Sequence, residues 1–322
     1  MRWITIEPHT HTVHSDGRYT VPGLLAAAKA ARLDAVVLTD HNTDSGLEGY
    51  VPRAGDPCLI PGIEWTTFYG HVVLIAPERH VEWRDLGPDD LDEHLRAAHE
   101  AGAVVQMAHP FCPGEPFCCG CRWEFRVEDW SGIDAIEVWS DADPGLCPHN
   151  EQAYELWRQK WREGFRPTAV SARDWHEDAP DVSTVFGVDR LYIDERLPMA
   201  EAVKDAYRAG RAYLTAGPEL DLWVESGGWR ATVGGSVPAG KARLSCVFSR
   251  GDRLPVWQTY DLEPRKVMLI AGDESLEFPF PGYDRPLETE VLLPPGPVFL
   301  ELHGTARGRP CRLLIANPVR AE

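Results

Sequence analysis

The chain has 322 residues, a formal net charge of −18 and a composition typical of an ordinary globular protein. This length suits one α/β barrel, or a barrel followed by a smaller module. A protein with this strong negative charge repels the negatively charged backbone of a nucleic acid, so we expect no nucleic-acid partner. No run is as apolar and long as a membrane span requires, and residues 1–7 lack the pattern of a signal peptide. We therefore expect a cytoplasmic protein without a membrane partner.

The first two-thirds of the chain alternates short apolar runs with helical patterns. Thr20 and Pro22 supply a capping hydroxyl and a first-turn proline, which mark the start of the first helix. Helices are predicted at residues 20–32, 88–101 and 150–162. Strands are predicted at residues 3–6, 35–39, 59–63, 72–76, 103–107, 133–139 and 168–171. Alternation of this kind implies parallel strands joined by crossover helices.

The pattern changes after residues 210–218, where helical periodicity ends and short β-type runs alternate with Gly/Pro turns. These runs lie at 220–224, 242–248, 266–270, 288–293, 298–303 and 312–315. Closely spaced strands with turn signals predict a small β-sandwich-like domain. We place the boundary at 218, which gives an α/β domain over 1–218 and a β-rich domain over 219–322. We expect the second domain to cap or shape the first, or to form a homo-oligomer.

Metal-ligand residue types recur at the ends of the predicted strands. The candidates are His9, His11, Asp16, His41, Glu64, His71, His109, Asp174 and His176. Barrel active sites are assembled from several strand ends on one face. Imidazole and carboxylate are the ligands of zinc, manganese and iron hydrolases. The pattern therefore predicts a site for more than one divalent ion, Zn, Mn or Fe.

Spacing and local chemistry suggest individual roles. His9 and His11 are two residues apart, so in an extended chain both point to the same side. Gly17 allows a turn that brings Asp16 back over the strand end. Glu64 is the best candidate for a carboxylate that bridges two ions. Asp40 could orient the ring of a neighbouring histidine or cap the next helix.

These motifs resemble, in order and spacing, the polymerase-and-histidinol-phosphatase (PHP) family. The residues that carry the resemblance are His9-Thr10-His11, Ser15-Asp16-Gly17, Thr39-Asp40-His41, Glu64, His71, Ala108-His109-Pro110 and Asp174-Trp175-His176. The resemblance covers residues 1–217 and implies a distorted, TIM-like (β/α)7 barrel. It also implies three ligand sets, namely His9, His11, Glu64 and Asp174; Glu64, His71 and His109; and Asp16, His41 and His176.

Short segments at 210–218, 234–237 and 315–319 resemble the CehA/McbA branch of that family, which is named for carbaryl hydrolases. The branch implies carbamate or ester hydrolysis, although most PHP relatives cleave phosphoesters. One departure concerns Arg173, because relatives often carry serine at that position. A cation there could bind an anionic group of the substrate or pair with a carboxylate such as Glu177.

The predicted function is hydrolysis of a small-molecule phosphoester by a metal-bridging hydroxide. The candidate catalytic residues are Glu64, Asp16, His14 and Arg173, and His14 or water near Arg173 could protonate the leaving group. A carbamate or carboxyl-ester hydrolase is the first alternative. Aromatic residues that flank the ligand motifs favour it, although core packing also explains them; they are Trp65, Phe68, Phe111, Trp123, Trp139 and Trp175. A non-catalytic metal-binding regulatory protein is the second alternative, and the complete ligand set argues against it.

Four cysteines, Cys112, Cys118, Cys119 and Cys121, follow the His109 motif within a short segment. They could bind a structural zinc ion, with Cys147 as a further ligand. Adjacent cysteines fit a tetrahedral ion poorly, and loop thiols without a metal are common. Without a secretory signal, the eight cysteines of the chain are better interpreted as thiols or ligands than as a disulfide framework.

Overall fold

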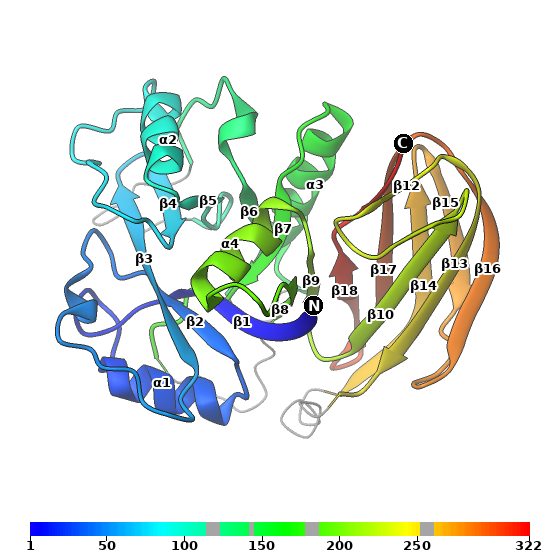
Figure 1. Cartoon of the computed structure of the whole chain (residues 1–322), viewed down its shortest axis with the longest axis horizontal. Helices are drawn as coiled ribbons and strands as arrows, with labels where there is room; N and C mark the ends of the chain where they lie inside the picture. The colour runs from blue at the N-terminus through cyan, green and yellow to red at the C-terminus, as the bar shows by residue number, and fades with distance from the viewer. Residues whose placement is uncertain (114–122, 142–144, 178–186, 252–260) are drawn as a thin grey trace.

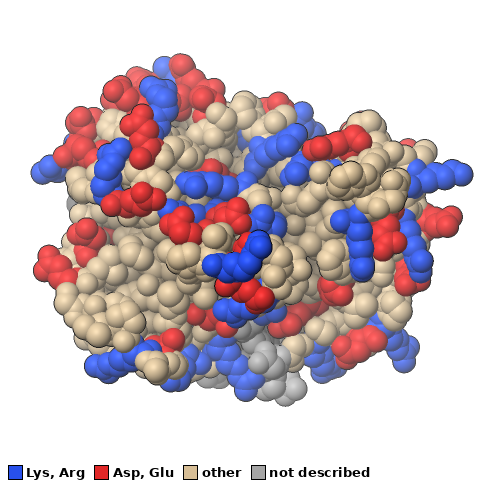
Figure 2. Space-filling view, in the orientation of Figure 1, with Lys and Arg blue, Asp and Glu red and all other residues tan. Residues whose placement is uncertain are grey.

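The computed structural model describes residues 1–113, 123–141, 145–177, 187–251 and 261–322. Its strands form one sheet of 15 strands and one of 4 strands. Figure 1 shows helices around the N-terminal part of the large sheet and strands packed on strands in the C-terminal part. On the face shown in Figure 2, acidic and basic side chains are intermixed over both parts. No helix in the described part of the chain has the length and apolarity needed to cross a membrane.

The N-terminal part is a mixed α/β structure. Its strands are β1 (Arg2–Thr10), β2 (Ala35–Leu38), β3 (Cys58–Thr67), β4 (Gly70–Ile75), β5 (Val104–Met107), β6 (Ala135–Ser140), β7 (Thr168–Ala172), β8 (Val188–Ile193) and β9 (Ala212–Thr215). Its helices are α1 (Val21–Ala30), α2 (Leu91–Glu100), α3 (Pro148–Arg162) and α4 (Met199–Arg208), with short 3₁₀ turns η1 (Ser45–Leu47) and η2 (Trp130–Gly132). The strands run side by side in the order β9-β8-β1-β2-β3-β4-β5-β6-β7. Thr20 caps α1 as predicted, because its hydroxyl accepts a hydrogen bond from the Gly23 N–H.

The prediction of parallel strands is confirmed for only part of this sheet. The pairs β1–β2, β2–β3, β5–β6 and β6–β7 are parallel. The pairs β3–β4 and β4–β5 are antiparallel, as are β1–β8 and β8–β9. Only Phe68 and Tyr69 connect β3 to β4, and so short a connection permits a hairpin but not a crossover. The hairpin places His71, at the start of β4, opposite Thr66 of β3.

The C-terminal part consists of strands from two sheets. Its strands are β10 (Glu219–Ser226), β11 (Trp229–Ala231), β12 (Ser236–Val237), β13 (Gly240–Ser249), β14 (Leu262–Ala271), β15 (Glu274–Pro279), β16 (Pro286–Leu293), β17 (Gly296–Ala306), β18 (Arg309–Ala316) and β19 (Val319–Ala321). The small sheet has the order β11-β10-β13-β16 and the other strands belong to the large sheet. Leu222, Leu244 and Phe248 of the small sheet share one buried core with Leu300 and Leu302 of the large one. All six β-type runs expected in this part of the sequence form strands.

The large sheet continues across residue 218. Strand β9 pairs antiparallel with β18, with Leu214 opposite Ile315. Near this junction the buried carboxylate of Glu301 accepts a hydrogen bond from the Tyr154 hydroxyl at 2.5 Å. Its other oxygen lies 3.1 Å from Nε of Arg312 and 2.6 Å from Nε2 of His303. The two parts therefore share a sheet and a buried polar cluster, and the domain boundary at 218 stays a prediction.

Candidate metal centre

Two segments far apart in sequence bring the first histidines to the last ligand motif. The His9 carbonyl accepts a hydrogen bond from the Trp175 N–H at 3.0 Å, and the His11 N–H donates to the Trp175 carbonyl at 2.9 Å. Thr10 and Trp175 thus form a parallel bridge between the end of β1 and the chain that follows β7. Both segments carry ligand candidates at positions i and i+2. The bridge therefore places Asp174 and His176 beside His9 and His11.

The remaining candidates come from neighbouring strands. His41 follows β2 and forms a parallel bridge with Glu64. Glu64 lies inside β3 rather than at its end, because the strand continues to Thr67. His109 follows β5 and has a positive φ of 26°, and Asp174 has a φ of 51°. Left-handed backbone is uncommon for residues other than glycine, and such strain gathers at functional sites.

Glu64 lies at the centre of the imidazole groups and is completely buried. Its Oε1 is 2.8 Å from Nδ1 of His71 and 3.2 Å from Nε2 of His109. Its Oε2 is 3.2 Å from Nε2 of His9, 3.5 Å from Nε2 of His11 and 2.7 Å from Nδ1 of His41. Each carboxylate oxygen therefore faces its own group of histidines. A carboxylate that bridges two ions has this arrangement.

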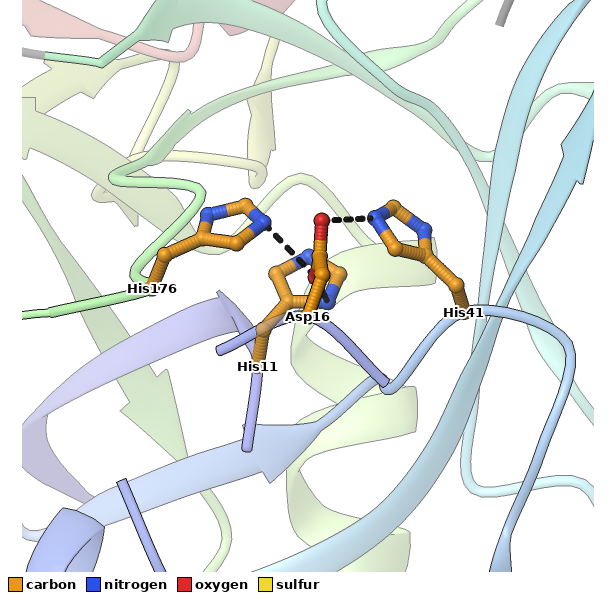
Figure 3. A group of neighbouring side chains, drawn as sticks. All are labelled: His11, Asp16, His41 and His176. Carbon is orange, nitrogen blue, oxygen red and sulfur yellow. Dashed lines mark ion pairs between the residues drawn. The ribbon is translucent and has the colours of Figure 1, made fainter. Parts of the chain in front are cut away.

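A second group surrounds Asp16, which lies between His176 and His41 in Figure 3. Asp16 Oδ1 is 3.1 Å from Nε2 of His176, and Oδ2 is 3.3 Å from Nε2 of His41. The rings of His11 and His176 stack with centroids 4.1 Å apart. The turn depends on Gly17, because a Cβ at that position would lie 2.5 Å from the His11 carbonyl. The predicted role of this glycine therefore has a steric basis.

The structure brings all nine candidates together. Four sets of ligand atoms have every member within 4.8 Å of the others; they are His9, His11, Glu64 and Asp174; His11, Asp16, His41 and His176; His41, Glu64 and His71; and His9, His109 and Glu137. The first set equals one of those implied by the family resemblance. The second contains another of them plus His11, whereas the implied set of Glu64, His71 and His109 is not among the four. Ligation itself stays a prediction, which we test below against the chemistry of these atoms.

Several buried atoms in this cluster lack a hydrogen-bond partner within the described residues. They are His9 Nε2, His11 Nε2, His71 Nε2, Glu64 Oε2 and Asp174 Oδ1. His11 Nε2 and Asp174 Oδ1 are only 2.9 Å apart, yet they are not aligned as donor and acceptor. Buried polar atoms normally have partners. Lone pairs that converge without mutual hydrogen bonds, from imidazoles and carboxylates, fit divalent Zn, Mn or Fe.

The charges of the cluster shift the pKa values of its members. Burial alone would raise the pKa of Glu64, but the facing imidazoles, His9 foremost, hold it well below its usual range. Burial likewise opposes the charge of His41, yet the facing carboxylates of Asp16 and Glu64 raise its pKa to about 10. The pKa of His109 rises to about 9 despite burial, because of the Glu64 carboxylate. Carboxylates in this centre are therefore ionised at neutral pH and bind either protonated imidazoles or metal ions.

Two predicted catalytic residues lie outside the four ligand sets. His14 is exposed, and its Nδ1 lies 2.9 Å from Oγ of Ser45. The guanidinium of Arg173 lies 3.9 Å above the ring of Trp175. Glu177, the carboxylate suggested as a partner of Arg173, lies 2.8 Å from Nε of Arg18. The catalytic roles of His14 and Arg173 stay predictions.

Asp40 has neither of the two roles suggested for it. Its Oδ1 accepts hydrogen bonds from the Thr12 N–H at 2.7 Å and the Ser15 hydroxyl at 2.8 Å. Its Oδ2 accepts a hydrogen bond from the Thr12 hydroxyl at 2.7 Å. Asp40 therefore fixes the turn that carries Asp16. The hydroxyl of Thr66, 2.5 Å from Nδ1, contacts the His41 ring instead.

Sequence reasoning missed the buried polar side chains beneath the ligands. Glu7, Gln106, Glu137 and Asp189 all have zero exposed area. Glu7 accepts hydrogen bonds from the backbone N–H groups of His9 and Arg173. Burial raises the pKa of Glu7 to about 8. The available signal was a charged residue inside an apolar strand run, since such residues are rarely buried without a partner.

The cysteine and aromatic candidates have mixed outcomes. Cys118, Cys119 and Cys121 lie outside the described residues. Cys112 is half-buried, and burial raises the pKa of its thiol to about 12. Trp65, Trp139 and Trp175 are buried core residues, as the packing explanation requires. Phe68 and Phe111 are 60% and 36% exposed, and Trp123 packs against Phe125 with ring centroids 5.3 Å apart.

No protein-family profile and no curated protein matches the sequence. Among solved structures, a two-domain protein from Bacteroides vulgatus that contains a predicted PHP-like metal-dependent phosphoesterase matches with a TM-score of 0.51. The match has 14% identity and covers 98% of this chain and 95% of that one. A predicted metal-dependent phosphoesterase from Bifidobacterium adolescentis matches with 18% identity and a TM-score of 0.39, over 62% of this chain and 94% of that one. The first match shows that the fold is shared along nearly the whole chain.

Proposed function

We propose that this protein is a PHP-type metal-dependent hydrolase of the CehA/McbA-like branch that cleaves a small-molecule phosphoester. The observation that carries the proposal is the position of Glu64, whose two oxygens face separate groups of histidines. The shared fold of the Bacteroides vulgatus protein supports it, since that protein contains a predicted phosphoesterase of this type. We take β1 to β7, with the Thr10–Trp175 bridge, as the distorted (β/α)7 barrel of the family.

The residues present fit a centre of two or three ions. The inner site consists of His9, His11, Glu64 and Asp174, and the outer site of Asp16, His41 and His176. We assign Glu64, His71 and His109 to the second site, because Oε1 of Glu64 contacts both imidazoles. Bound divalent ions would supply Lewis-acid activation of water and neutralise the charge that develops on the ester oxygens. Orphaned buried nitrogen and oxygen atoms in the inner site support this assignment.

Differences in exposure indicate the side from which a substrate approaches. The side chains of His9, His11 and Glu64 are fully buried, whereas Asp16 is 57% and His41 23% exposed. A substrate therefore meets the outer site first. Although burial opposes it, hydrogen bonds from His176 and His41 hold the pKa of Asp16 well below its usual range. Asp16 is therefore a charged ligand rather than a proton donor.

The donor of a proton to the leaving group must be a different residue. His14 is exposed and lies two residues from Asp16 in the same turn. Its Nδ1 contacts Ser45, so this hydroxyl can fix the ring orientation. We assign His14 as general acid on these grounds. Arg173 contributes positive charge behind the ligands, where it lowers the pKa of Glu7 against the larger effect of burial.

One observation favours a carbamate or carboxyl ester as the alternative substrate. Phe68 lies at the tip of the β3–β4 hairpin and Phe111 lies two residues after His109, and both rings are exposed. Exposed aromatic rings near ligand segments suit an aromatic leaving group. Phosphoester and carbamate substrates must therefore be compared directly.

The test is hydrolysis of p-nitrophenyl phosphate, bis-p-nitrophenyl phosphate and 1-naphthyl N-methylcarbamate by protein loaded with manganese, zinc or iron. Metal content is counted on the same samples. We expect metal-dependent turnover of a phosphate ester. Turnover of the carbamate alone would show that the substrate is a carbamate rather than a phosphoester, and the assignment as a metal-dependent hydrolase would stand. Protein that binds no stoichiometric metal would overturn the proposal.

A further inference from the structure

A buried carboxylate in β6, Glu137, contacts ligand residues on both sides of Glu64. Its Oε1 lies 2.7 Å from Nδ1 of His9 and 2.7 Å from Nε2 of Gln106. Its Oε2 accepts a hydrogen bond from the His109 backbone N–H at 2.8 Å. Glu137 has zero exposed area, so these interactions are shielded from bulk solvent. Three N–H donors thus converge on one carboxylate beneath the proposed centre.

The contact with His9 determines which ring nitrogen faces the inner site. A neutral imidazole carries its proton on one nitrogen and a lone pair on the other. When Nδ1–H donates to Glu137, the lone pair is on Nε2. This atom lies 3.2 Å from Glu64 Oε2 and 3.3 Å from Asp174 Oδ1. Carboxylates that accept a hydrogen bond from the far N–H of a ligand histidine orient the ring and increase its basicity.

The contact with His109 acts on the backbone. His109 has a positive φ of 26°, a conformation that a non-glycine residue adopts only when its surroundings hold it there. The hydrogen bond from its N–H to Glu137 Oε2 supplies part of that support. The same conformation directs the His109 ring to Glu64 Oε1, 3.2 Å from its Nε2. Glu137 therefore also fixes a ligand of the second site.

We infer that Glu137 is a positioning residue that couples the inner and second sites, by holding the His9 ring and the His109 backbone with one carboxylate. This inference rests on the proposed metal centre. Coupling between two binding sites is reciprocal, so the order imposed by an ion at either site assists binding at the other. Loss of Glu137 must then weaken both binding steps, although it contacts no metal-facing atom of the second site.

The test is a zinc titration of metal-free protein in competition with a chelating indicator. The Glu137→Gln side chain keeps the shape of glutamate but replaces one acceptor oxygen by an NH₂ group. That group faces at least one of the three N–H donors and cannot accept a hydrogen bond from it. We expect the apparent affinity of both binding steps to fall roughly 10- to 100-fold, the range typical when a partner of a ligand histidine is lost. Thermal unfolding of the metal-free protein is recorded in parallel. It separates ligand positioning from a general loss of stability.

Asp189→Asn is the matched control. Asp189 is equally buried in the same interior, but its hydrogen bonds go to the Ser171 N–H and the Tyr207 hydroxyl. An asparagine can accept from the first and donate to the second, so we expect unchanged zinc affinity. An equal loss in Asp189→Asn would show that the interior, not Glu137, is responsible and would overturn the inference.

The remaining outcomes separate this inference from the proposed function. If the unmodified protein binds no zinc, the proposed function fails. If it binds two or more ions and Glu137→Gln weakens one step only, the coupling is wrong while the function stands. Where Glu137→Gln does not fold, Glu137→Asp replaces it, because aspartate keeps the charge but shortens its reach. For Glu137→Asp, a loss of zinc affinity at both steps that is smaller than 10- to 100-fold supports the inference. Unchanged zinc affinity at both steps overturns it.

Discussion

Metal uptake by this centre must release protons, and its affinity must therefore depend steeply on pH. In the metal-free protein the pKa of His41 is about 10 and that of His109 about 9, because the carboxylates that face them outweigh burial. At pH 7 both imidazoles carry a proton that a metal ion has to displace. Each displaced proton changes the apparent affinity about tenfold per pH unit, so two give roughly 100-fold per unit between pH 6 and 8.

Calorimetric titration in two buffers of different ionisation enthalpy counts the released protons. We expect at least two per fully loaded chain at pH 7. Competition with a chelator at pH 6, 7 and 8 then gives the slope of affinity against pH. Release of less than one proton, together with an affinity that does not vary with pH, would refute the assignment of His41 and His109 as ligands.

The same shifts determine how pH affects the stability of the metal-free protein. The folded-state pKa values of His41 and His109 lie above the unfolded value of about 6.5. The contribution of these two protonated imidazoles to the free energy of unfolding is thus fully present below pH 6.5. It is lost as pH rises through 9 to 10. Denaturant titrations should show metal-free protein losing stability from pH 7 to 10. Equal stability at both pH values would contradict the charge assignment.

Three further predictions concern activity and stability. His9→Ala and Asp174→Ala should each lower metal-dependent hydrolysis at least about 100-fold in chelator-treated buffer, because both remove an inner-site ligand, and full rates would rule out the inner site. Trp157→Ala should lower the free energy of unfolding by about 3 to 5 kcal/mol, since this ring is fully buried, and a loss under about 1 kcal/mol in denaturant titration would contradict that packing. Glu301→Ala should lower the free energy of unfolding by about 1 to 3 kcal/mol, because it removes the buried acceptor of the Tyr154 hydroxyl and one of the two carboxylates that pair with Arg312, whereas the exposed control Glu288→Ala should lower it by less than about 1 kcal/mol.

The sequence predicts best where local pattern and structure coincide. The run that became β2 is continuously apolar, and the strand is buried along its full length. The β3–β4 hairpin was predicted as parallel strands, because the length of a connection, not strand pattern, decides direction. Strand β8 was missed because Asp189 and Arg190 interrupt its apolar pattern, and each finds its partner far along the chain.

The ligand candidates could be named from sequence because their motifs are local. Their grouping could not be derived from spacing, since Asp16 meets His41 and His176 only through the fold. Glu137 was missed for the same reason. Glu137 stands as a charged residue inside an apolar run, but its contact with His9 joins residues 128 positions apart, so the sequence does not show its partner.

The most direct test is to count the ions bound by metal-free protein after equilibrium dialysis against zinc or manganese, using inductively coupled plasma mass spectrometry. If the converging lone pairs around Glu64 and Asp16 form a metal centre, two or three ions should bind per chain, and His9→Ala should bind fewer. Less than one ion per chain in the unmodified protein, with either metal, would contradict the metal centre and the hydrolytic function proposed from it.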